Sequence, residues 1–350
     1  MSCSGCAAPA RLSGSRYNPL LPMNYRTLGR CGAKVSEIGF GAWAIGGPSQ
    51  SAGIQFGWGE VPEEDAVGAV RRARELGVNF FDTADVYGQG RSEEVLGKAL
   101  AGDTEAYVAS KVGNVTRGGR LAKDFSRAHI ERSCEASLRR LRREVLDLYQ
   151  LHNPGVKEIR TGDWPDTMER LQEQGKIRWY GVSIFKPSEA LAVLERSCGH
   201  TLQLVYNALR QEMAEDVLPR AQEKNFGVIA RVPLYYGLLA GKFSSDTVFP
   251  FNDHRSHTLP PDKMRELAPR AAKFVRLAAD SGEVSPARWA LRFVLSHPVV
   301  STTIPGARNA GQAEQNALAS DRTSLPPGQV DAARRLWAED DYLHELRSGS

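Results

Sequence analysis

The chain has 350 residues, of which 41% are apolar and 25% charged, a composition that allows a large buried core and excludes disorder of the whole chain. Its 45 basic and 41 acidic residues leave a net charge of +4 without a dense basic stripe, which argues against nucleic acid as a partner. No run approaches the ~18 apolar residues of a membrane span, so we expect a soluble protein without a membrane partner.

The five cysteines, an odd number, argue against a disulfide framework and favour a reducing, cytoplasmic location. Cys3 and Cys6 form a C-x2-C pair, but no second pair follows at zinc-finger spacing, so we expect no metal site. Residues 1–22 contain no apolar signal-peptide core. They are predicted to be a disordered leader to a single domain over residues 23–350.

From Tyr25 onward, short β-branched runs alternate with amphipathic stretches, a pattern typical of βα units around a parallel sheet. The first elements are a predicted hairpin, Tyr25–Thr27 and Lys34–Ser36, placed to close the bottom of a barrel. Pro62 then begins a predicted helix with three acidic residues in its first turn and Gly77 just past its end.

Eight runs read as strands, which favours a closed (β/α)8 barrel over an open, doubly wound sheet. They are Glu37–Trp43, Asn79–Asp82, Ala106–Lys111, Leu146–His152, Ile177–Ser183, Thr201–Tyr206, Gly227–Val232 and Val299–Ile304. Arg127–Arg143 is predicted to be one of the helices between them. Lys242–Pro261, rich in Ser, Pro, His and Asp, is the longest stretch without a predicted element and a candidate lid.

Polar residues end three successive predicted strands: Asp82, Lys111 and His152. In a barrel these ends converge on one mouth, where active sites lie, and Tyr87 follows in a short loop that can face the same mouth. A carbonyl that receives a hydride needs a proton, and an ammonium beside Tyr87 would stabilise its phenolate and so assist proton transfer. Asp82 would hold that ammonium, and His152 would donate a hydrogen bond to the substrate oxygen.

None of these groups donates a hydride, so a nicotinamide must supply it. The chain resembles the aldo-keto reductase superfamily, including the related beta subunits of potassium channels. The likeness lies in YRTLGRCGAKVSEIGFGAWAIGG (Tyr25–Gly47) and NFFDTADVYGQGRSEEVLGKAL (Asn79–Leu100). The resemblance implies a catalytic tetrad, whose members are Asp82, Tyr87, Lys111 in ASKVG and His152 in LYQLHNP.

The resemblance also implies where the cofactor binds. The segment GVSIF matches the family's carboxamide-binding GVSNF at Ser183, with Ile184 in place of Asn, and Gln203 matches the third contact. Arg231 stands where an aromatic platform for the nicotinamide is usual, and a planar guanidinium can stack in its place. The remaining implied cofactor contacts are Pro233, Leu234 and Gly237 in RVPLYYGLLAGKF, and Gly306, Ala307, Arg308, Gln312 and Asn316 in IPGARNAGQAEQN.

Because an arginine suits bidentate phosphate contact, Arg308 favours NADPH, with NADH as the alternative. Trp43, Trp58 and Asn153 are the expected substrate contacts, and the substrate class stays open among aldehydes, ketones, sugars and secondary metabolites. Two other functions remain: a cofactor-binding sensor of the same fold, and a metal-dependent hydrolase or lyase that uses Asp82 and His152. The sequence does not indicate the oligomeric state.

Overall fold

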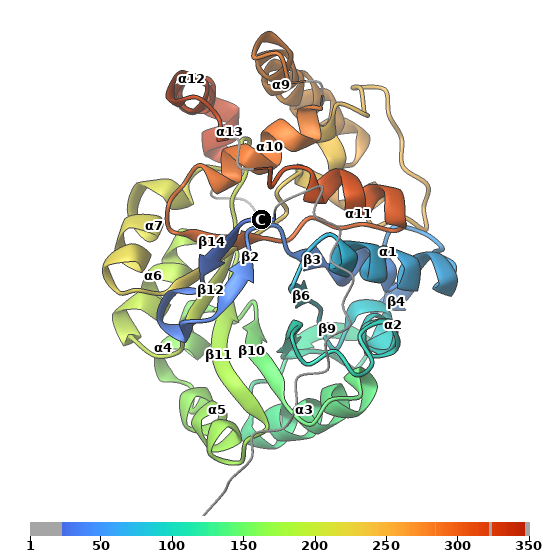
Figure 1. The fold of residues 1–350 in the computed structure, drawn as a ribbon, viewed down its shortest axis with the longest axis vertical. Helices are drawn as coiled ribbons and strands as arrows, with labels where there is room; N and C mark the ends of the chain where they lie inside the picture. Colours follow the sequence, from blue (N-terminus) through green and yellow to red (C-terminus); the bar gives the residue numbers. More distant parts are fainter. Residues whose placement is uncertain (1–22, 284, 322–323, 347–350) are drawn as a thin grey trace, which may run out of the picture.

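A barrel of eight parallel strands lies at the centre of the molecule (Figure 1). The computed structural model describes residues 23–283, 285–321 and 324–346, so the predicted leader and the Cys3/Cys6 pair lie outside the described residues. The strands of the barrel, in spatial order, are β3 (Phe40–Gly41), β6 (Phe80–Asp82), β7 (Tyr107–Val112), β10 (Leu146–His152), β11 (Ile177–Ser183), β12 (Thr201–Val205), β13 (Gly227–Arg231) and β14 (Val300–Thr303).

Backbone hydrogen bonds join the first strand of the barrel to the last. The N–H of Gly39 donates to the carbonyl of Thr303 at 2.8 Å, and the N–H of Gly41 donates to that of Pro305 at 3.0 Å. A Cβ at Gly41 would lie 2.5 Å from the carbonyl oxygen of Ile304, so this approach requires glycine. The predicted (β/α)8 barrel is confirmed.

Helices cover the outside of the barrel and bury their apolar faces against the strands. In α1, for example, Ala66, Ala69, Val70 and Ala73 are buried. The helices are α1 (Glu63–Glu75), α2 (Arg91–Ala99), α3 (Arg127–Leu141), α4 (Val156–Thr161), α5 (Trp164–Glu173), α6 (Pro187–Arg196), α7 (Met213–Glu223), α8 (Arg255–Thr258), α9 (Pro261–Asp280), α10 (Pro286–Leu295), α11 (Ala310–Ala317), α12 (Pro327–Ala338) and α13 (Asp341–Glu345), with 3-10 turns η1 (Gly29–Cys31), η2 (Ala42–Ile45), η3 (Tyr87–Gly90) and η4 (Tyr235–Ala240).

The antiparallel hairpin of β1 (Tyr25–Thr27) and β2 (Lys34–Ser36) lies across the barrel in Figure 1. Leu28 and Val35 from the hairpin pack with Phe80, Leu148 and Ile229 from the strands in one buried cluster inside the barrel. The predicted hairpin and its place are therefore confirmed. It leaves only the opposite end of the barrel free for a site.

Two of the predicted segments differ from the structure. The first predicted strand, Glu37–Trp43, is reduced to β3, because the chain turns into η2 from Ala42. Ala44 and Ile45 are buried in that turn, so an apolar run could not distinguish it from a strand. Lys242–Pro261 is not wholly without structure, since α8 forms within it and the buried Phe249 anchors it.

Two further hairpins, absent from the sequence-based prediction, follow the strand ends. One consists of β4 (Ser49–Ser51) and β5 (Ile54–Phe56), and the other of β8 (Asn114–Arg117) and β9 (Arg120–Lys123). Gly118 and Gly119, both with positive φ, form the turn of the second hairpin, and this Gly-Gly pair is a signal that could have predicted it.

The hairpin plug gives a stability prediction. Leu28 is 1% exposed inside the barrel, so Leu28→Ala should lower the free energy of unfolding by about 2–5 kcal/mol through lost burial and a cavity. Leu121→Ala is the matched control, because Leu121 is 49% exposed and its loss should cost less than about 0.5 kcal/mol. Equal urea midpoints for the two variants would contradict the plug.

Candidate active site

The four predicted tetrad residues come together at one end of the barrel. Asp82 and His152 are the last residues of β6 and β10, Lys111 lies near the end of β7, and Tyr87 begins η3 just after β6. Since the strands are parallel, their carboxyl ends share one rim. The tetrad lies at this rim, opposite the hairpin plug.

Lys111 connects the tetrad. Its fully buried ammonium lies 2.6 Å from Oδ2 of Asp82, and it donates to the carbonyl of Thr83 at 2.7 Å and to the hydroxyl of Tyr87 at 3.3 Å. Burial opposes the charge, but Asp82 and Tyr87 outweigh burial and raise the pKa of Lys111. A permanent positive charge therefore lies beside the phenol oxygen, an arrangement that stabilises a phenolate.

His152 is neutral in this site. Burial lowers the pKa of its imidazole well below the usual value, and the charges of Lys111, Lys123 and Arg231 lower it further. Its ring meets that of Tyr87 edge to face at 5.7 Å between centroids, and its buried Nδ1 has no partner among the described residues. A neutral imidazole can donate a hydrogen bond but is a poor proton donor.

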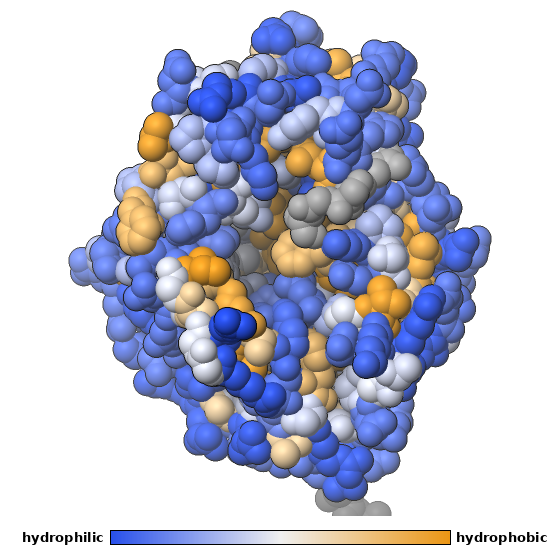
Figure 2. Space-filling model, turned by 180° about the vertical axis from the view of Figure 1, so that it is seen from behind, coloured by the Kyte–Doolittle hydropathy of each residue, from blue (hydrophilic) through white to orange (hydrophobic). Residues whose placement is uncertain are grey.

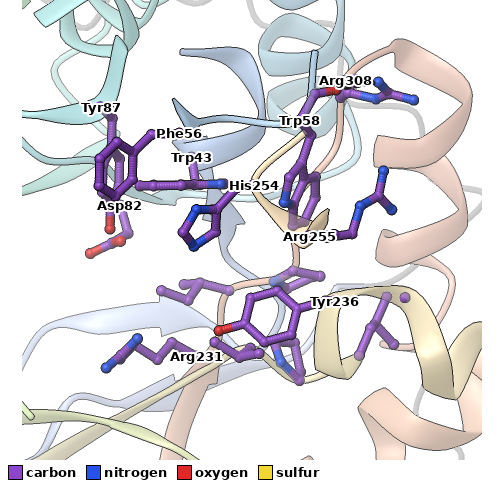
Figure 3. Close-up of a pocket in the computed structure, with 18 of the residues that line it drawn as sticks. Trp43, Phe56, Trp58, Asp82, Tyr87, Arg231, Tyr236, His254, Arg255 and Arg308 are labelled. Atoms are coloured by element: carbon purple, nitrogen blue, oxygen red, sulfur yellow. Dashed lines mark hydrogen bonds between the residues drawn. The ribbon is translucent and has the colours of Figure 1, made fainter. Parts of the chain in front are cut away.

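Asp82, Tyr87 and His152 line one end of a pocket of about 1480 Å3, whereas the fully buried Lys111 does not line it. Figure 2 shows the hollow on the face seen from behind. In Figure 3, Asp82 and Tyr87 lie at one end, Trp58 and Arg308 at the other, and Arg231 and Tyr236 face them from below. Its length suits a ligand much larger than one small carbonyl compound.

The segment after β13 forms one wall of the pocket. Arg231, Pro233, Leu234 and Gly237, four of the predicted cofactor contacts, all line the pocket. Nη2 of Arg231 donates to the carbonyl of Ile184 at 3.1 Å, and the guanidinium stacks on the ring of Phe185 at 4.1 Å. The plane of the Arg231 guanidinium is thus fixed in this wall of the pocket.

The loop after β14 and the start of α11 form the far end. Gly306, Arg308, Gln312 and Asn316 line the pocket there, whereas Ala307 is fully buried and does not. Nη1 of Arg308 donates to the carbonyl of Trp58 at 2.8 Å, which joins this loop to the chain after β5. The first N–H groups of a helix are suited to bind an anion, so this end fits a phosphate group.

Two of the residues predicted to bind the carboxamide, Ser183 and Gln203, are hydrogen-bonded to each other. Gln203 lines the pocket, donates to Oδ1 of Asp82 at 2.6 Å, and accepts from the hydroxyl of Ser183 at 3.3 Å. Ser183 is buried behind Gln203 and does not line the pocket, and the side chain of Ile184 belongs to the apolar core. Ser183 and Ile184 therefore contact the pocket only through their neighbours.

The predicted substrate residues all line the pocket. The ring of Trp43 packs edge-on against that of Tyr87 at 4.7 Å between centroids, and Trp58 lies farther along the same wall. Asn153 follows His152 with a positive φ of 55°, and its Oδ1 accepts from Arg231 at 3.3 Å. Asn153 thus places Arg231 close to the tetrad.

Sequence reasoning missed several residues that line the pocket: Phe56, Asp85, Asn114, Lys123, His254 and Arg255. Phe56, Asn114 and Lys123 belong to the two unpredicted hairpins, which meet through a hydrogen bond between Ser51 and Thr116. Asp85 lies two residues before Tyr87, within Asn79–Leu100, one of the two segments that carry the family resemblance. Burial, followed by the charge of Glu93, raises the pKa of its carboxyl to about 7.

A (β/α)8 barrel with a Tyr, Lys, Asp and His cluster at the carboxyl ends of its strands defines a carbonyl oxidoreductase. Residues 37–338 match the model of the aldo/keto reductase family. The chain belongs to this family, whose members use nicotinamide cofactors.

Individual relatives agree with the family. The chain is 31% identical to the aldo-keto reductase YhdN of Bacillus subtilis (strain 168) over 83% of this chain and 87% of that protein. The solved glycerol dehydrogenase AKR11B4 of Gluconobacter oxydans superposes with a TM-score of 0.73 at 31% identity, covering 90% of this chain and 95% of the other. A rice (Oryza sativa subsp. japonica) protein named as a probable voltage-gated potassium channel subunit beta is 28% identical, over 88% of this chain and 94% of its own length.

Two other findings concern the described part of the chain alone. It contains no group of three or more His, Cys, Asp or Glu side chains arranged to hold a metal ion. None of its helices combines the length and the apolar character needed to cross a membrane.

The buried ion pair gives a prediction with a defined pH dependence. Asp82→Asn should cost about 3 kcal/mol of unfolding free energy near pH 7, because Lys111 would be left charged and buried without its counterion. Asp82 raises the pKa of Lys111, so its removal favours the neutral amine, and the loss should shrink as the pH approaches about 10.

Urea unfolding at both pH values tests this expectation. Asp124→Asn is the control, because its partner Arg117 is 65% exposed and such a pair contributes less than about 1 kcal/mol. A loss no larger than that of the control would show that Lys111 does not depend on Asp82 for its charge.

Proposed function

We propose that this protein reduces an aldehyde or ketone to an alcohol with NAD(P)H, and that Tyr87 is the general acid. The observation that carries the proposal is the 3.3 Å contact between the buried ammonium of Lys111 and the hydroxyl of Tyr87, beside a pocket whose volume of about 1480 Å3 has room for a dinucleotide. The experiment that tests it follows loss of the reduced-nicotinamide absorbance with a panel of aldehydes, ketones and sugars.

The residues of this chain can supply the proton that the reduced carbonyl oxygen needs. Tyr87 releases its hydroxyl proton to the carbonyl oxygen, and the adjacent Lys111 stabilises the phenolate left behind. Asp82 holds Lys111 in place at 2.6 Å, and the neutral His152 orients the carbonyl through a hydrogen bond. The phenolate then regains a proton from solvent, so one proton is consumed for each carbonyl reduced.

The residues present fit a nicotinamide dinucleotide. Arg231 is held flat beside the tetrad, Pro233, Leu234 and Gly237 line the wall beside it, and the loop after β14 leads to the N-terminus of α11. Bound there, the cofactor would supply the hydride to the carbonyl carbon. Gln203 would hold the carboxamide and Arg231 would stack on the ring, with Ser183 supporting Gln203.

NADPH is the cofactor that we propose, with NADH as the alternative. Arg308 lines the far end of the pocket, beside Gln312 and Asn316. A guanidinium there favours a 2′-phosphate through charge-assisted hydrogen bonds, and Gly306 allows the backbone to approach the diphosphate.

In this proposal the substrate is a small carbonyl compound that contacts Trp43 and Asn153 beside the tetrad. Trp58, the third residue predicted to contact it, lies with Arg308 at the other end of the pocket. A cytoplasmic location also belongs to the proposal, and the three free cysteines of the described residues, Cys31, Cys134 and Cys198, support it.

A second candidate is a cofactor-binding sensor with slow or no turnover. The likeness to the rice channel subunit named above favours it. The complete tetrad, with every contact needed for proton transfer, favours the reductase instead. The two differ in one observable, since a sensor would bind NADPH tightly without consuming it.

Removing the phenol hydroxyl of Tyr87 should slow carbonyl reduction without weakening the binding of NADPH. Tyr87→Phe should lower kcat for carbonyl reduction by at least about 100-fold, the lower range for loss of a general acid, while the Kd for NADPH stays within a factor of about 3. Tyr107→Phe, on β7, is the control and should keep full turnover, since Tyr107 does not line the pocket. Undiminished turnover in Tyr87→Phe would exclude the Tyr87 hydroxyl as the general acid.

Arg308→Ala tests the phosphate contact. The variant should weaken NADPH binding about tenfold or more and NADH binding little, as loss of a charge-assisted contact predicts. Fluorescence titration with both cofactors measures this, with Arg276→Ala on the exposed face of α9 as the control. Equal weakening of both cofactors would give Arg308 the structural role of tying the chain at Trp58.

A further inference from the structure

One wall of the pocket, next to the tetrad, offers hydrogen-bond donors and positive charge. It consists of Asn114 and Lys123 from the β8–β9 hairpin, with Asn153 and Arg231 from the strand ends, and we call it the donor wall. Lys123 donates to the backbone carbonyl of His152 at 2.8 Å, which places its ammonium beside the tetrad.

The side-chain oxygens of the two asparagines in the donor wall already accept hydrogen bonds from its two cations. Oδ1 of Asn114 accepts from Lys123, and Oδ1 of Asn153 accepts from Arg231 at 3.3 Å. An amide that faces a cation must present its oxygen, so the NH2 group of each asparagine is the part left for a ligand. The third N–H of Lys123 and the Nε of Arg231 also have no protein acceptor among the described residues.

The charges of the donor wall are also unpaired. Within the described part of the chain, neither Lys123 nor Arg231 forms an ion pair with a carboxylate. Glu189 is the carboxylate whose charge acts most strongly on Lys123, but its Oε2 accepts from the N–H groups of Phe185 and Lys186 instead. Asp85 also acts on Lys123 from a distance, and burial raises the pKa of Asp85 to about 7, so its charge is only partial near neutral pH.

We propose that the donor wall binds an anionic oxygen group of the substrate, a carboxylate or a phosphate, a few atoms from the carbonyl that is reduced. Such a group has only acceptors, which is what a wall of N–H donors and two cations without carboxylate partners would recognise. The inference rests on the proposed reductase function and names its substrate class: oxo acids or phosphorylated carbonyl compounds.

Matched aldehydes test the proposal. Wild-type protein with NADPH should reduce 3- or 4-carboxybenzaldehyde with a kcat/KM about tenfold above that of the methylbenzaldehyde of the same shape, the effect of about 1.4 kcal/mol. Glyceraldehyde 3-phosphate against glyceraldehyde tests the phosphate in the same way. Whichever pair shows the preference identifies the anion, and a preference close to or below one in both pairs overturns the proposal.

Lys123→Met should bring that preference close to one, because the variant keeps an unbranched side chain only one heavy atom shorter and removes its charge. Arg120→Met is the matched control, since Arg120 is exposed on the same β9 strand and does not line the pocket. It should keep the wild-type preference. An unchanged preference in Lys123→Met, or an equal loss in Arg120→Met, would contradict the donor wall.

Failure of the proposed function can be told apart from failure of this inference. If no aldehyde is reduced, the reductase proposal fails, and the donor wall is tested by titrating benzoate and benzyl alcohol into the NADPH-bound protein. Benzoate binding that weakens about tenfold in Lys123→Met, with no such change for benzyl alcohol, would support the wall. Absence of benzoate binding would overturn it.

Discussion

The site depends on a single buried ion pair, that of Lys111 and Asp82. A buried ammonium is costly unless a counterion and hydrogen bonds compensate it, and here Asp82, the carbonyl of Thr83 and the Tyr87 hydroxyl take all three of its N–H donors. Burial, followed by the same charge on Lys111, lowers the pKa of His152, and that charge lies 3.3 Å from the Tyr87 hydroxyl, where it would stabilise a phenolate. Both the stability of the fold and the proposed proton transfer therefore require that Lys111 be charged and paired with Asp82.

The barrel explains how these residues reach one another. They come from β6 and the loop after it, from β7 and from β10, and parallel strands closed into a ring bring their carboxyl ends to a common rim. The β1–β2 hairpin fills the opposite end with Leu28 and Val35, and the glycine at position 41 lets the first strand approach the last. The outer helices then bury the remaining apolar surface of the strands.

The sequence was sufficient for the strands, the plug and the tetrad, because β-branched runs with polar residues at their ends are local patterns. Prediction from the sequence failed where contacts between distant segments determine the local structure or the position of a residue. The η2 turn after Gly41 has the same buried apolar residues as a strand would have. Lys123 is an ordinary lysine in the sequence, and only the folding back of the β8–β9 hairpin brings it to His152. The side chain of Ile184, which stands in place of the family's Asn, packs in the core, while its backbone carbonyl accepts a hydrogen bond from Arg231.

Transfer of a deuterium label tests the central claim most directly. The protein is incubated with an aldehyde and NADPH that carries deuterium at the reactive carbon, and the alcohol is analysed by mass spectrometry. One deuterium is expected on the former carbonyl carbon, and this transfer should be lost in Lys111→Met, because Tyr87 would lack its neighbouring charge. Tight NADPH binding without label transfer, or undiminished transfer in Lys111→Met, would contradict it.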